Sequence, residues 1–218
     1  VGRGEWAFCA DGLSVSTAPG DYAVARYIHS PQPPAYFDTI HAEKITATFT
    51  IAEASGDSDP TAMFIVDYTS PTEFAFVSIS ETSDQVCIGR YENGIWHYDQ
   101  TIPVTIDDLP ATIESGEKYA LTFITDHAFP QSVVSLYRFS DYATLARAEF
   151  AGYGAGGVGL GAVDGVVSFD SLDFMRWDVS PFGDIPSGQR YDFSEFQVSP
   201  LPMGALGIDA LGNAYVQN

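Results

Sequence analysis

The chain has 218 residues, of which 45% are hydrophobic and 14% aromatic, and it contains 20 glycines and 13 prolines. This length fits one domain with a large core, and so many turn-forming and strand-forming residues favour an all-β sandwich or barrel over helices. Only 9 lysines and arginines oppose 29 aspartates and glutamates, so a net charge of −20 argues against nucleic acid and anionic membranes as partners. No stretch approaches the ~20 apolar residues of a membrane helix, so we expect no membrane insertion.

The acidic composition also leads us to expect that the protein lies outside the cell. An acidic surface suits saline water, and clustered aspartates suit Ca²⁺, so both interpretations predict an extracellular protein. The chain begins at Val1-Gly2 without the pattern of a signal peptide. We therefore expect a module cut from a larger secreted or surface protein, with flanking modules.

Taken in order, the apolar pattern predicts short strands separated by turn signals. Residues 4–15 predict two strands around Asp11-Gly12, and residues 22–28 and 45–51 predict one strand each. Residues 61–96 show period-two alternation between three turn signals, which indicates three or four consecutive antiparallel strands. The last of these signals, Asn93-Gly94, suits a type I′ hairpin turn because both central residues need positive φ.

The second half continues in the same way. Residues 119–125 and 133–139 predict strands, whereas residues 145–150 are ambiguous between a strand and a helical turn. The glycine-rich run before residue 163 lacks the strand-to-helix context of a dinucleotide site, so its glycines are expected to allow turns and close backbone packing. A Pro/Gly-rich linker follows, and residues 205–216 predict a terminal hairpin. We expect a sandwich over residues 1–177 and a C-terminal extension over residues 178–218.

Three groups of residues occur in an order that carries a family resemblance. They are Trp6 with Asp11-Gly12; Asp67, Tyr68, Pro71 and Phe74 followed by Gly89, Arg90, Asn93, Gly94 and Trp96; and residues 157–161 with Phe169-Asp170. The order resembles bacterial concanavalin A-like (laminin G-like) jelly-roll domains over roughly residues 5–174. The resemblance implies an antiparallel jelly-roll β-sandwich of a secreted or bacterial surface protein.

The resemblance also raises a question about the C-terminus. Members of this family often begin with a strand that the chain lacks at its start, and the similar string Tyr191-Asp192-Phe193-Ser194 appears late. Residues 191–198 are therefore predicted to complete the sandwich. The alternative is a separate extension or the start of another module.

Residues 90–98 form the densest candidate for a binding site. If Ile95 points inward, Trp96 and Tyr98 share the opposite face of a strand, where exposed aromatic rings would stack on a sugar. The alternative is that Trp96 only covers the sheet. The predicted glycan-binding residues are Asp67, Tyr68, Arg90, Tyr91, Trp96, His97 and Tyr98.

The sequence contains no clear catalytic motif. The E-x-D-x-E string with which hydrolases of such sandwiches place two carboxylates on one strand is absent, and the four histidines lack metal-ligand spacing. We expect a non-catalytic extracellular module that binds a glycan or cell-surface polysaccharide. The alternatives are a structural, calcium-stiffened adhesin module and a glycoside hydrolase with an unrecognised site.

The resemblance to concanavalin A-like jelly rolls implies calcium as the expected cofactor, because such domains often hold one structural Ca²⁺. Asp57 and Asp59 are spaced like hard-cation ligands in an acidic loop, and Asp164 and Asp170 are further candidates. The two cysteines, Cys9 and Cys87, have two interpretations: one disulfide, or two small buried side chains.

Overall fold

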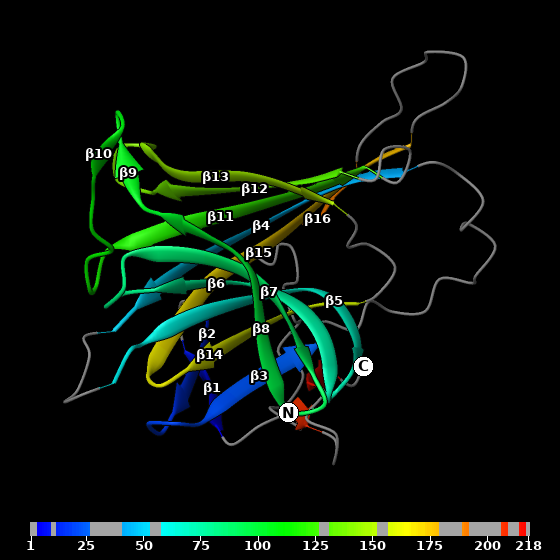
Figure 1. Ribbon diagram of the computed structural model, residues 1–218. Coiled ribbons are helices and arrows are strands. Elements are labelled where there is room, and N and C mark those ends of the chain that lie inside the picture. The colour runs from blue at the N-terminus through cyan, green and yellow to red at the C-terminus, as the bar shows by residue number, and fades with distance from the viewer. Residues whose placement is uncertain are drawn as a thin grey trace.

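The protein is an all-β antiparallel jelly-roll sandwich of two large sheets, as the fold prediction states (Figure 1). The computed structural model describes residues 4–9, 12–26, 41–52, 58–126, 131–151, 157–178, 189–191, 206–208 and 214–216. None of these segments forms a helix long and apolar enough to cross a membrane.

The first sheet has eight strands in the order β1-β2-β15-β4-β11-β12-β13, and β16 pairs with β15. Its strands are β1 Gly4–Cys9, β2 Gly12–Thr17, β4 His41–Ile51, β11 Lys118–Asp126, β12 Gln131–Arg138, β13 Thr144–Ala151, β15 Val166–Asp178 and β16 Gln189–Tyr191. The ambiguous residues 145–150 are therefore a strand, at the edge of this sheet.

The second sheet has six strands in the order β3-β14-β5-β6-β7-β8. Its strands are β3 Tyr22–Arg26, β5 Thr61–Ser70, β6 Glu73–Ser80, β7 Gln85–Glu92, β8 Ile95–Pro103 and β14 Gly157–Val163. Two small hairpins complete the description, β9 Thr105–Ile106 with β10 Leu109–Pro110, and β17 Leu206–Ile208 with β18 Ala214–Val216. The consecutive hairpins β5 to β8 confirm the prediction for residues 61–96.

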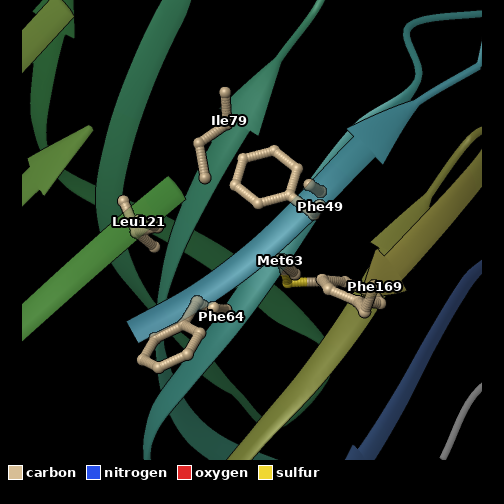
Figure 2. A pocket seen from close by; sticks show the side chains of 8 residues that line it. Phe49, Met63, Phe64, Ile79, Leu121 and Phe169 are labelled. Carbon is tan, nitrogen blue, oxygen red and sulfur yellow. The ribbon is translucent and has the colours of Figure 1, made fainter. Parts of the chain in front are cut away.

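The core lies between the two sheets and follows the alternation of the strands. On β6, Ala75, Val77 and Ile79 belong to this core, whereas Phe74 and Phe76 point to the other face of the sheet. Figure 2 shows core residues from both sheets around one interior space, among them Phe49, Phe64, Ile79, Leu121 and Phe169. The side chains leave no room there for a water molecule, so this interior space is not a ligand site.

Two turn-related predictions are confirmed by the backbone. Asn93 and Gly94 have φ values of 53° and 88°, so both take the left-handed conformation that a type I′ turn requires. The glycine-rich run leads into β14, where a Cβ on Gly161 would lie 2.5 Å from the carbonyl oxygen of Ala23. The absence of a side chain at Gly161 therefore permits the close backbone packing that the sequence predicts.

The C-terminal predictions are met in part. Tyr191 pairs with Phe174 of β15, which joins the start of the segment 191–198 to the eight-stranded sheet, and residues 192–198 lie outside the described residues. The predicted terminal hairpin is present, since Leu206–Ile208 pairs antiparallel with Ala214–Val216.

Candidate functional site

The face of the six-stranded sheet that points away from the core carries a second apolar cluster. Its members come from alternate positions of the strands, and most are fully buried. They are Val24, Met63, Ile65, Tyr68, Phe74, Phe76 and Tyr91, with Tyr22, Trp96 and Val163 packed against them. We call this set the aromatic cluster.

The aromatic cluster is buried because the sheet curls over it. Tyr22 lies on β3 at one edge of the sheet, and its hydroxyl donates to that of Tyr91 on β7 at 3.2 Å. The Tyr22 ring also meets the indole of Trp96, on β8 at the opposite edge, with 5.3 Å between ring centroids. Contact between opposite edges makes this face concave and fills it with the side chains of the sheet. Burial and the hydrogen bond to Tyr91 raise the pKa of Tyr22.

Trp96 and Tyr98 share this concave face, as the sequence predicts. Both rings contact Phe76 edge to face, at centroid distances of 5.1 Å and 5.9 Å respectively. They differ in exposure: Trp96 is half-buried against Tyr91, whereas Tyr98 on the edge strand exposes 60% of its surface. Ile95, which alternation places on the other face of β8, is 59% exposed beside the β7–β8 turn.

Tyr68 and Tyr91, two further predicted binding residues, also lie on the concave face. They are only 7% and 8% exposed, and each stacks on Phe74. Both therefore serve the packing of the aromatic cluster and are closed to a ligand.

The remaining predicted binding residues lie on the opposite face. Backbone pairing aligns Asp67 with Ala75, Ala75 with Arg90, and Arg90 with His97. Ala75 belongs to the core between the sheets, so this row points away from Tyr98. The structure therefore does not bring Asp67, Arg90 and His97 together with the predicted binding residues Trp96 and Tyr98.

Arg90 has acidic partners on its own face of the sheet. Its guanidinium forms ion pairs with Glu92 at 2.9 Å and with Asp99 at 3.1 Å. These groups are exposed, so the pairs are screened by solvent and contribute little to stability. Their effect is local, since they hold Arg90 along the β7–β8 hairpin.

Asp59, a predicted calcium ligand, is engaged by protein groups. Its carboxylate accepts hydrogen bonds from the Ser80 hydroxyl at 2.7 Å, the Ser83 hydroxyl at 3.1 Å and the Thr82 amide at 3.1 Å. These bonds tie the loop before β5 to the β6–β7 turn. Asp59 thus has a structural role that spacing alone does not reveal.

The other predicted calcium ligands do not gather around Asp59. Asp164 accepts a hydrogen bond from the amide of Gly20, Asp170 pairs with Lys118 at 3.0 Å, and Asp57 lies outside the described residues. Within the described ranges, no three acidic, histidine or cysteine side chains are grouped as metal ligands. Calcium binding remains a prediction.

The cysteines are both free thiols, so the disulfide interpretation is wrong. Cys9 is exposed on β1 of the first sheet, whereas Cys87 lies on β7 of the second sheet. The Cys87 sulfur lies 3.7 Å from the Thr101 hydroxyl, and burial raises the pKa of its thiol. The alternative of two small buried side chains describes the half-buried Cys87 better than Cys9.

Comparison with known proteins identifies the fold but no sequence family. No family model matches the chain, and no curated protein sequence is significantly similar. Many solved structures are similar in three dimensions. The chain is therefore placed by its geometry alone.

Three of these structures show the extent of the likeness. The carbohydrate-binding module CBM66 from Bacillus subtilis has a TM-score of 0.55 at 15% identity, over 77% of this chain and 89% of that chain. The winged bean acidic lectin, complexed with methyl-α-D-galactose, has a TM-score of 0.57 at 12% identity, over 83% and 92%. Lectin I from Ulex europaeus, complexed with the methyl glycoside of α-L-fucose, has a TM-score of 0.56 at 10% identity, over 81% and 91%. At these identities the likeness establishes the shared concanavalin A-like fold.

Proposed function

We propose that this chain is a non-catalytic, extracellular glycan-binding module, and that it binds a neutral saccharide at the rim of the concave sheet around Tyr98. The observation that carries the proposal is the 60% exposure of the Tyr98 ring, which Phe76 supports from beneath and beside which Trp96 is fixed. A supported, exposed aromatic ring presents an apolar face for the C–H groups of a sugar. Similar solved structures that bind sugars on the same fold add to this support.

The charge around Tyr98 favours a neutral ligand. Burial raises the pKa of the Tyr98 hydroxyl, and the negative charges of Asp59 and Asp164 raise it further. The same field would repel a carboxylate or sulfate on a saccharide, as would the net charge of −20. The neutral phenol can donate a hydrogen bond to a sugar hydroxyl.

The proposal is tested on an array of neutral and acidic glycans, with the wild-type protein and two variants. Tyr98→Ala should lose at least tenfold in affinity for the glycans bound, because the stacking surface is removed. Phe8→Ala is the matched control, since Phe8 is a similarly exposed aromatic residue on β1. Equal binding by Tyr98→Ala and the wild type would contradict the proposal.

A second candidate, a structural module without a ligand, is favoured by one observation. The aromatic cluster fills the concave face, so most of the surface that could hold an extended glycan serves packing instead. This candidate predicts no binding across the array. Running the array and thermal melts with Ca²⁺ and with a chelator also tests the calcium prediction, because a structural ion would raise the melting temperature.

A further inference from the structure

We infer that the turn between β12 and β13 forms a second saccharide-binding site, built on Phe139 and Tyr142. Phe139 is 40% exposed and Tyr142 is 73% exposed. Their ring centroids lie 5.9 Å apart, with an angle of 44° between the rings. This site belongs to the eight-stranded sheet, so it is separate from Tyr98 and does not depend on the function proposed above.

The backbone of this turn has an unusual conformation at Tyr142. Tyr142 has a φ of 58°, in the left-handed region, which a bulky aromatic residue rarely adopts. The other non-glycine residues with positive φ in the described ranges are aspartates and one asparagine, which tolerate this conformation. An ordinary turn would be more stable with glycine or asparagine at this position, so the presence of tyrosine suggests a role for its side chain.

Hydrogen bonds hold the turn in this conformation. The Arg138 guanidinium donates two hydrogen bonds to the Asp141 carboxylate, with Nε 3.0 Å from Oδ1. The same carboxylate accepts a hydrogen bond from the Ala143 amide at 3.1 Å. The bonds from Arg138, together with this one, lower the pKa of Asp141 to about 2. Tyr142 is thus fixed between two anchored neighbours before any ligand arrives, which lowers the entropic cost of binding.

The polar groups beside the rings form two ion pairs. The Lys118 ammonium lies 5.6 Å from the centre of the Phe139 ring and 3.0 Å from the Asp170 carboxylate, and Arg138 pairs with Asp141. Two cations therefore face two carboxylates, in a chain with a net charge of −20. These ion pairs supply hydrogen-bond donors and acceptors around apolar rings, which is the chemistry that recognises a neutral saccharide.

The angle between the Phe139 and Tyr142 rings limits the kind of saccharide that can stack on both. Rings at 44° cannot both lie flat on a straight, ribbon-like chain, whereas successive sugar rings of a coiled chain turn relative to one another. The expected ligand is therefore a neutral polysaccharide with a helical backbone. Leu109, 69% exposed on the small β9–β10 hairpin at the same end of the sandwich, offers further apolar surface for a longer chain (Figure 1).

The test is electrophoresis of the folded protein through native gels that contain one polysaccharide each. The probes are a soluble β-1,3-glucan and soluble amylose as coiled neutral chains, hydroxyethyl cellulose as a straight neutral chain, and alginate as an acidic chain. The variants are Tyr142→Gly, Phe139→Ala and Tyr98→Ala, with Phe8→Ala as control. Tyr142→Gly is informative because glycine accepts the left-handed backbone, so this variant should melt at or above the wild-type temperature.

We expect a coiled neutral probe to retard the wild type and Phe8→Ala, and Tyr142→Gly and Phe139→Ala to lose at least tenfold in affinity for it. Tyr98→Ala should still be retarded by the coiled probe through the Phe139–Tyr142 site, which is the part of the retardation that Tyr142→Gly loses. The inference would be overturned if Tyr142→Gly migrated like the wild type in every neutral gel. It would also be overturned if alginate were the only probe that retards the wild type. Self-association in sedimentation that Tyr142→Gly abolishes, without any retardation, would overturn it in favour of contact between two copies.

Discussion

Replacing Phe76 with alanine tests whether the concave face is a core or an open surface. Phe76 is 1% exposed, and its ring contacts Phe74, Trp96 and Tyr98. The ring also lies over Gly89 of the neighbouring strand, where a Cβ would come within 2.9 Å of it. Glycine has no side chain to fill the space that truncation leaves, so the cavity should persist. We expect a loss of about 3–5 kcal/mol in the free energy of unfolding, which is typical of buried Phe→Ala changes.

This loss is measured by urea denaturation followed by tryptophan fluorescence. With a slope of about 2 kcal/mol per molar urea, the midpoint should fall by about 1.5–2.5 M while the slope stays constant. Phe64→Ala, at a residue that is 2% exposed between the two sheets, is the matched control and should lose a similar amount. A loss below about 1 kcal/mol for Phe76→Ala, beside a full loss for Phe64→Ala, would refute the claim that the aromatic cluster is a second core.

Three further predictions follow from the polar contacts. Burial and the hydrogen bond to Tyr91 raise the pKa of Tyr22, so the contribution of the neutral phenol to folding stability is complete below about pH 10 and is lost as the pH rises. Melting temperatures from about pH 9 to 12 should therefore fall less steeply for Tyr22→Phe than for the wild type. Asp59→Ala should cost about 1–3 kcal/mol in urea denaturation, since it leaves the donors of the β6–β7 turn without their acceptor. A thiol reagent should modify two groups per chain, with exposed Cys9 reacting faster than Cys87, whose thiol pKa is raised; a single reactive group after denaturation would contradict this.

Alternation along the chain was enough to predict most of the strands. The hairpins from β5 to β8 follow from Phe64, Val77 and similar apolar positions, and from the Asn93-Gly94 turn, all of which are local signals. The same alternation predicts that Trp96 and Tyr98 share a face. Local pattern therefore predicts which residues point together.

The candidate site was less predictable because its geometry depends on distant contacts. Tyr22 and Tyr91 are 69 residues apart, and their contact exists because the sheet curls until its edges meet. No local signal reports that curvature, so the burial of Tyr91 could not be foreseen. Arg90 is close to Trp96 in sequence but lies on the other face of the sheet, because one residue of offset along a strand reverses the face.

The energetics of the aromatic cluster explain why a ligand site on this sheet belongs at its rim. Opening the concave face to a sugar would expose Phe74 and Phe76, and each buried aromatic side chain of this kind contributes about 1.5–3 kcal/mol through burial alone. A saccharide bound with millimolar affinity gains only about 4 kcal/mol, which such an opening would consume. Tyr98 avoids this cost because its ring is already exposed and already supported from beneath. The curling closes the centre of the sheet, so the proposed binding at β8 on its edge would leave the aromatic cluster closed.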